Sequence, residues 1–311
     1  MKLSASLALI SDLRAAIRVA TLPTLKAVYF EPSLVLRPAS VSRIFMAAVW
    51  NVFATPTDQG ARATKLSLIS HATGAVLDIG AGLGHSIDYL DRDKVTAYIA
   101  LEPNELMYPA ILARAKAAGF RDEEVLILRG CGAEDPKTIL AQLDHAGIRV
   151  DTMLSVLTLC SIPDPQQTLA RLVREVLAPG GRLLFYEHVL SPRSDVAWWQ
   201  RFWTPVWRLA FDGCCLDRPT HLWVEEIEDV GPDGQSINMW SHREVWGKEG
   251  EPEEHLFLAP FYRLRYRAHL QYFWPPYAID AFPFKRYLSL SSTSGLGRLS
   301  TSEYLPSVSY D

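Results

Sequence analysis

The chain has 311 residues, of which 49% are hydrophobic and 21% are charged, and its net charge at pH 7 is −4. This length and composition are typical of a folded protein with one large domain and appendages, or with two small domains. The small negative charge, without a local basic patch, argues against a nucleic-acid partner.

The N-terminal part, residues 1 to 70, reads as helices and turns separated by prolines, and we interpret it as a helical extension or lid. Its apolar run at 44–53 is too short to span a bilayer, which requires about 20 apolar residues. Such a run is typical of a helix that packs on a core, closes over an active site or lies on a membrane surface. No signal peptide is recognisable. We therefore expect a cytoplasmic protein, with peripheral contact to an intracellular membrane as the alternative.

Strand and helix patterns alternate after residue 70. Short apolar runs predict strands, and two helices are expected, one over 105–118 and one that Asp164 caps and Pro179-Gly180-Gly181 ends. This order predicts an α/β fold whose mostly parallel sheet carries helices on both faces, with ligands bound outside the carboxyl ends of the strands. The predicted strands are 75–79, 97–101, 125–128, 150–157 and 182–186.

The C-terminal third begins with an aromatic-rich helical stretch over 195–212, part of which we expect to face a substrate. One further strand is expected within 261–272, and the final strand of the sheet is not placed. Residues 285–311 are rich in Ser and Thr and predict a flexible tail. We divide the chain into an extension (1–70), a central domain (71–258) and a divergent C-terminal segment (259–311).

The four cysteines are Cys131, Cys160, Cys214 and Cys215. None forms a C-x-x-C pair and no histidines cluster at zinc spacing, so we expect no metal site. Two of the cysteines are adjacent, which suits a disulfide framework poorly. Small buried thiols in a reducing compartment are the expected arrangement.

A glycine-rich loop follows the first strand, in the order Asp78-Ile79-Gly80-Ala81-Gly82-Leu83-Gly84. Glycines after a strand allow a ligand to approach the backbone. A dinucleotide site would place glycine where His85 stands, and Asp78 is a poor neighbour for a pyrophosphate but suits a cationic ligand. Glu102 follows the second strand, where a carboxylate accepts hydrogen bonds from ribose hydroxyls.

Three segments resemble motifs of class I S-adenosylmethionine (SAM) dependent methyltransferases, namely 76–84, 101–104 and 177–184. Three others resemble the type 11, methyltransferase-like family of membrane-associated alkyl thiol methyltransferases, namely Leu157–Ile162, Tyr186–Val189 and Phe211–Cys214. The resemblance implies a Rossmann-like sheet, SAM as cofactor and methyl transfer as the reaction.

The cofactor-binding residues that we predict are Asp78, Gly80, Gly82, Gly84, Glu102, Glu134 and Ser155. Glu134 follows the third strand and is expected to accept a hydrogen bond from the adenine amino group, or else to be a helix cap or surface acid. Ser155 is expected to lie close to the methionine part of the cofactor, which it would contact through its backbone more than its side chain.

On the acceptor side, His188 at the tip of the fifth strand is the candidate base, because imidazole titrates near neutrality, with a purely structural role as the alternative. Asp212 is the second candidate, with a turn-forming role as its alternative.

Transfer of the SAM methyl group to a thiol, hydroxyl or similar nucleophile on a small apolar acceptor is the function that these motifs predict. Secondary-metabolite biosynthesis is compatible with it. The alternatives are an NAD(P)-dependent oxidoreductase and a non-catalytic scaffold that keeps the fold. The sequence leaves the oligomeric state open.

Overall fold

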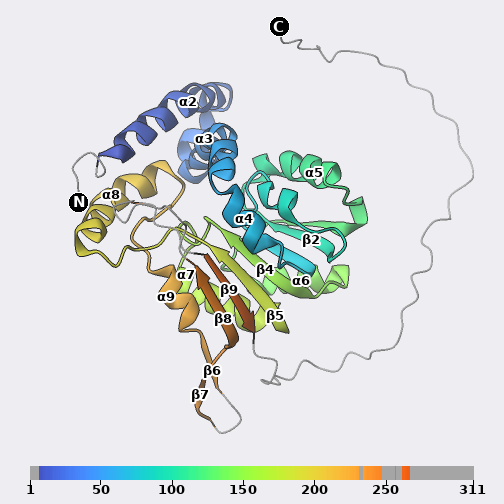
Figure 1. The fold of residues 1–311 in the computed structure, drawn as a ribbon. Coiled ribbons are helices and arrows are strands. Elements are labelled where there is room, and N and C mark those ends of the chain that lie inside the picture. The colour runs from blue at the N-terminus through green and yellow to red at the C-terminus, as the bar shows by residue number, and fades with distance from the viewer. Residues whose placement is uncertain (1–6, 231–233, 247–255, 257–260, 267–311) are drawn as a thin grey trace, which may run out of the picture. The chain divides into compact units, whose positions relative to one another are not determined.

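The computed structural model describes residues 7–230, 234–246, 256 and 261–266, and within them the main sheet has the strand order β3-β2-β1-β4-β5-β9-β8 (Figure 1). The first five strands pair in parallel, whereas β9 is antiparallel to both of its neighbours. The mostly parallel α/β sheet that the sequence predicts is thereby confirmed. The strands are β1 (Gly74–Ile79), β2 (Val95–Leu101), β3 (Val125–Leu128), β4 (Val150–Val156), β5 (Leu177–Tyr186), β8 (Trp240–Trp246) and β9 (Phe261–Tyr266).

Helices connect the strands, and a small hairpin of β6 (Glu228–Val230) and β7 (Ser236–Asn238) precedes β8. The α-helices are α2 (Ala8–Phe30), α3 (Pro38–Gly60), α4 (Arg62–Ile69), α5 (Tyr108–Ala117), α6 (Pro136–Ala146), α7 (Pro165–Arg171), α8 (Ser194–Ala210) and α9 (Thr220–Glu225). Shorter turns of helix are η1 (Pro32–Leu36), η2 (His85–Tyr89), η3 (Glu105–Met107), η4 (Asp122–Glu124) and the π-helical η5 (Leu172–Val176).

The sheet is buried on both faces because successive side chains of a strand point to opposite sides. In β1, Leu77 and Ile79 join the core cluster that α6, α7 and α9 complete. Val76, from the same strand, joins the cluster on the other face, which α4, η2 and α5 complete. This two-sided burial explains the near-continuous apolar runs that mark these strands in the sequence.

A third core cluster joins the N-terminal helices to α8. Figure 1 shows α2 and α3 side by side, and Ala16 of α2 and Val49 of α3 belong to one buried cluster with Val196 and Trp207 of α8. The N-terminal region is therefore helical, as predicted, and it packs on the domain. Within the described residues, no helix combines the length and apolar character needed to cross a membrane.

Two local predictions around α7 were wrong. Asp164 has a positive φ of 41° and its side chain accepts no capping hydrogen bond. The helix also ends before Pro179, because the chain is already strand from Leu177, which pairs with Val150 of β4. Pairing with the buried neighbour strand outweighs the helical periodicity of the last turn.

The C-terminal strands complete the sheet. The predicted strand within 261–272 corresponds to β9, which inserts between β5 and the strand that precedes it in the chain, β8. The strand that the sequence left unplaced is β8, which precedes β9 in the chain and forms one edge of the sheet. The predicted flexible tail at 285–311 lies outside the described residues.

Candidate functional site

A cavity of about 1030 Å³ lies at the carboxyl ends of the parallel strands. The loops after β1, β2, β3, β4 and β5 all contribute to its lining, as do α3 and the end of α8. Small-molecule sites commonly measure about 300–1,000 Å³, so this volume is sufficient for a cofactor together with an acceptor. The site lies where the order of strands reverses between β1 and β4, as expected for an open α/β sheet.

The glycine loop forms part of the cavity wall through Gly80 and Gly82, which both have positive φ angles. A Cβ atom on Gly80 would lie 2.3 Å from the Thr158 side chain, and one on Gly82 would lie 2.8 Å from Nε1 of Trp50. Neither position therefore accepts a side chain. Together with Trp50 and Thr158, the loop forms a narrow backbone cradle of the kind that a nucleoside-containing ligand requires.

Glu102 has the geometry that ribose binding requires. Its side chain is 7% exposed and lines the cavity, with one carboxylate oxygen accepting the N–H of Gly82 and the other that of Asn104, both at 2.8 Å. A carboxylate has about four acceptor positions, so about two remain for ligand hydroxyls. Burial raises the pKa of Glu102, and the two backbone donors oppose this rise.

Three other predicted cofactor residues support the site without lining the cavity. Asp78 is 1% exposed beneath the loop and accepts the Tyr98 hydroxyl at 2.7 Å. Gly84 has a φ of 78°, and a Cβ there would lie 3.3 Å from the backbone of Ile111, so it permits close packing of α5. Ser155 is fully buried and donates to Glu187 at 2.7 Å. These three residues therefore lie behind the cavity wall, and their predicted roles toward the cofactor stay predictions.

Glu134 and Asp212 both line the cavity and are exposed to solvent. The helix cap considered for Glu134 belongs instead to its neighbour Asp135, which accepts the N–H of Thr138 at 3.1 Å. Asp212 occupies a turn with a φ of 46° and accepts the Ser42 hydroxyl at 3.1 Å. Its turn-forming role is therefore present, while its role toward an acceptor, like that of Glu134 toward adenine, stays a prediction.

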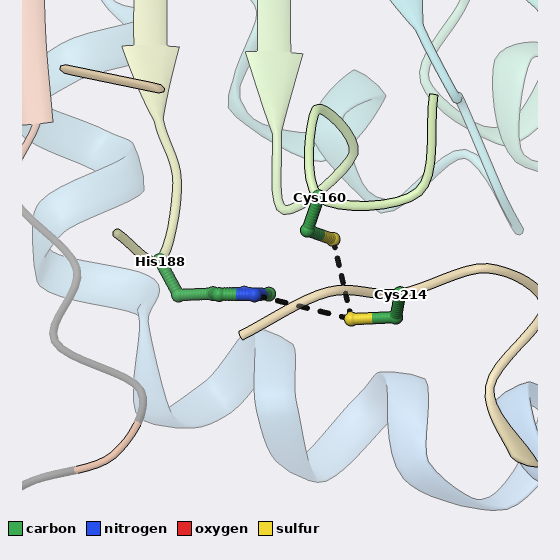
Figure 2. Close-up of side chains that lie close together, drawn as sticks. All are labelled: Cys160, His188 and Cys214. Atoms are coloured by element: carbon green, nitrogen blue, oxygen red, sulfur yellow. Dashed lines mark hydrogen bonds between the residues drawn. The ribbon is translucent and has the colours of Figure 1, made fainter. Parts of the chain in front are cut away.

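His188 lies beside two cysteines that the sequence did not single out. Nε2 of His188 is 3.9 Å from Sγ of Cys214, which is 3.4 Å from Sγ of Cys160 (Figure 2). Burial disfavours the charged imidazole, but the negative charge of Cys160 and a hydrogen bond to it outweigh burial and raise the pKa of His188 to about 9. The role of His188 as a base stays a prediction.

Glu187 organises the loop after β4. One of its oxygens accepts both the Ser155 hydroxyl and the Thr158 N–H, while the other is buried without a hydrogen-bond partner. Burial, together with the charge of Cys160, raises the pKa of Glu187 to about 7. The carboxylate therefore fixes the position of Thr158 above Gly80.

The expected aromatic wall is present in part. Trp207 and Phe211 line the cavity, whereas Trp198 and Phe202 stack on each other and are 56% and 55% exposed. Sequence reasoning missed the contributions of Met46, Trp50 and Phe53 from α3, although it allowed that the run 44–53 might be a lid. Their apolar character was visible, but which helix face meets the cavity depends on tertiary packing.

Comparisons with known proteins place this site in a family context. Residues 56–225, more than half of the chain, match the family described as a methyltransferase domain. Thiol S-methyltransferase TMT1B is 40% identical over 156 residues in Rattus norvegicus and 33% identical over 158 residues in Homo sapiens. These matches cover 49% and 50% of this chain respectively and 59% of each relative, so the chain spans less than two thirds of either relative.

A solved structure of an O-methyltransferase family protein from Burkholderia thailandensis aligns with a TM-score of 0.48 and 11% identity. The alignment covers 74% of this chain and 60% of that chain.

Asp78 makes the stability of the fold depend on pH. Burial raises its pKa from 3.8 to about 6, so between these values the folded state binds more protons than the unfolded state. The free energy of unfolding then falls as the pH rises through this window, by about 3 kcal/mol for a shift of two units. Asp78→Asn should remove this decrease while keeping an acceptor for Tyr98. Urea unfolding at pH 4 and pH 7 measures the free energy of unfolding and so tests this prediction. Asp144→Asn, a substitution at an exposed position, is the control. The prediction is wrong if this free energy changes with pH in the same way in the wild type and in Asp78→Asn.

Glu102→Ala should weaken the binding of SAM and of its demethylated product alike. A hydrogen bond to a charged group contributes about 1.5–3 kcal/mol, which corresponds to roughly a 10- to 150-fold increase in Kd. Isothermal titration calorimetry measures both constants. Glu123→Ala is the matched control, because this acid is 63% exposed and lies outside the cavity lining. Unchanged affinity in the Glu102 variant would remove Glu102 from the cofactor site.

Proposed function

Because the chain belongs to the methyltransferase-domain family, we propose that it transfers the methyl group of SAM to the thiol of a small apolar acceptor. The observation that carries this proposal is that one cavity joins Glu102 and the glycine loop to His188 and the aromatic wall. The rat and human relatives are named thiol S-methyltransferases, which favours sulfur as the acceptor atom.

The order of the strands separates the two ligands of this reaction. Along the carboxyl edge, Glu102 follows β2, the glycine loop follows β1, Thr158 follows β4 and His188 follows β5. Neighbouring strands are about 4.8 Å apart, so the glycine loop and His188 are separated by about 10 Å. The cofactor therefore fits over β2 and β1, and the acceptor fits near the end of β5.

The cofactor, when bound, supplies a methyl group on a positively charged sulfur. Glu102 would hold the ribose, and Gly80 and Gly82 would let the ligand approach the backbone. Trp207 and Phe211 would bind the apolar part of the acceptor and exclude water. Methyl transfer requires mainly that acceptor and methyl group be held close and in line, which such a cavity achieves without a strong base.

The family match supports methyl transfer over a nicotinamide-dependent oxidoreductase. A non-catalytic scaffold would keep the same fold. A measurement of product formation from SAM and an acceptor distinguishes such a scaffold from an enzyme.

Incubation with SAM and a panel of alkyl thiols, phenols and polar thiols tests the activity, with methylated products measured by mass spectrometry. We expect turnover of apolar thiols in preference to polar ones. Phe211→Ala should raise KM for an apolar thiol by about 10- to 150-fold, because burial of an aromatic side chain contributes about 1.5–3 kcal/mol. Phe202→Ala, which removes an exposed aromatic outside the cavity lining, is the control. SAM binding without turnover of any acceptor would favour the scaffold.

We also propose that the N-terminal helices contact a membrane surface peripherally. Large apolar side chains are strongly exposed at the end of α2 and in η1, with Phe30 82% and Leu36 84% exposed. Exposed apolar groups that lie close together are typical of interaction surfaces.

Flotation with phosphatidylcholine vesicles tests this contact. The Phe30→Ser/Leu36→Ser double variant should bind several-fold less than wild type, because it removes two side chains that would enter the interface. Leu112→Ser, on α5 and 47% exposed, should float like wild type. Equal flotation of all three proteins, or none, would contradict the proposal.

A further inference from the structure

Three potential metal ligands converge on one wall of the cavity. Cys160 lies in the loop after β4, His188 just beyond β5, and Cys214 after α8, and Figure 2 shows their side chains pointing toward one another. Their ligand atoms all lie within 4.8 Å of one another, and the residues are 3%, 5% and 9% exposed. The convergence requires three separate segments and would not arise from local spacing.

Two of the three separations lie close to those of a tetrahedral zinc centre. Zn–S bonds of about 2.3 Å and Zn–N bonds of about 2.0 Å place two sulfurs about 3.8 Å apart, and a sulfur and a nitrogen about 3.5 Å apart. The observed distances are 3.4 Å between the sulfurs of Cys160 and Cys214 and 3.9 Å from Cys214 to Nε2 of His188. Each of these two separations differs from the zinc value by about 0.4 Å, and all three ligand atoms lie within 4.8 Å of one another.

We propose that Cys160, Cys214 and His188 bind a zinc ion whose fourth coordination position faces the cavity. Two thiolates and an imidazole are ligands typical of zinc, whereas the hard cations calcium and magnesium prefer oxygen ligands. Among the described residues, no fourth His, Cys, Asp or Glu belongs to the group. Structural zinc sites use four protein ligands, whereas sites with three leave a position for water or substrate. All three residues line the cavity, which gives a ligand there access to the metal.

Binding of zinc requires His188 to give up a hydrogen bond. Nε2 of His188 is 3.1 Å from the carbonyl oxygen of Cys215, to which it can donate a hydrogen bond. Zinc binds neutral imidazole through Nε2 and both sulfurs as thiolates, so the Nε2 proton and every thiol proton still present pass to solvent water.

This site deepens the proposed function and, in its catalytic role, rests on it. The fourth position would bind the acceptor sulfur as a thiolate, with the thiol proton released to water. That sulfur then forms a bond to the methyl carbon, while the electron pair of the broken carbon–sulfur bond stays on the cofactor sulfur. Methylation converts the thiolate into a neutral thioether, which binds zinc more weakly and can leave.

Metal binding is tested on the full chain, purified under reducing conditions, by elemental analysis and by titration with Co²⁺. We expect one zinc per chain, and for cobalt the intense visible bands of tetrahedral coordination with a thiolate charge-transfer band. Cys214→Ser should weaken zinc binding by more than the roughly 10- to 100-fold that loss of an outer-shell partner causes. Cys215→Ser is the matched control, because this neighbouring thiol is also buried and lies outside the group.

Calorimetry with the demethylated cofactor product shows whether each variant is folded, independently of the metal. Addition of an alkyl thiol should shift the cobalt bands of the wild type if the fourth position faces the cavity. No metal in folded wild type, a Cys160–Cys214 disulfide that persists under reducing conditions, or equal metal affinity in Cys214→Ser and Cys215→Ser would overturn the site. An unchanged cobalt spectrum would overturn the open position.

Activity after chelation separates this inference from the proposed function. Loss of thiol methylation with retained cofactor binding, restored by zinc, supports the catalytic role. Full methylation by the metal-free protein would overturn that role and leave the proposed function intact. A protein that binds zinc but methylates no thiol would overturn the proposed function and the role of the metal in it, while the metal site itself would stand.

Discussion

Two neighbouring parallel strands, β1 and β4, direct the chain that follows them to opposite faces of the sheet, and the cavity depends on this divergence. After β1, Ile87 of η2 packs into the core cluster on one face. After β4, Leu169 of α7 and Leu172 of η5 pack into the cluster on the other. The carboxyl ends of the two strands are therefore left between the two layers of helices, where backbone groups can meet a ligand. Glu102 strengthens this arrangement by tying the glycine loop to the end of β2.

The divergence leaves an opening between the two layers of helices, and α3 and α8 cover it. Val49 of α3 and Trp207 of α8 share a buried cluster, and both residues also line the cavity. The same packing therefore stabilises the N-terminal helices and supplies an apolar wall near Cys160 and Cys214, which belong to this cluster as well. This apolar wall beside sulfur and imidazole groups is the basis of the proposal that the acceptor is an apolar thiol. The wall comes from packing between segments that lie far apart in the sequence.

Sequence reasoning was most successful where a local pattern has one physical solution. Gly80, Gly82 and Glu102 line the cavity at the tips of β1 and β2, because strand, turn and helix patterns determine these positions. It was least successful where the outcome depends on long-range packing. The grouping of Cys160, His188 and Cys214 has no spacing signal, since 27 residues separate Cys160 from His188 and 25 separate His188 from Cys214. Only the rule that strand ends meet at one edge could have brought two of the three together.

Asp78 and Ser155 show that a sequence motif predicts the position of a residue better than it predicts the contacts of its side chain. Asp78 lies inside the motif, but its carboxylate accepts the Tyr98 hydroxyl beneath the loop. Ser155 is likewise buried against Glu187, which in turn holds Thr158 over Gly80. A backbone cradle has few side chains of its own, so its shape must be maintained by buried polar groups below it. Hydrogen bonds of this kind are strong where water is excluded, and each one restricts the loop to a single arrangement. The acids beneath the loop thus serve the ligand indirectly, by keeping the backbone of the cradle in the conformation that a ligand needs.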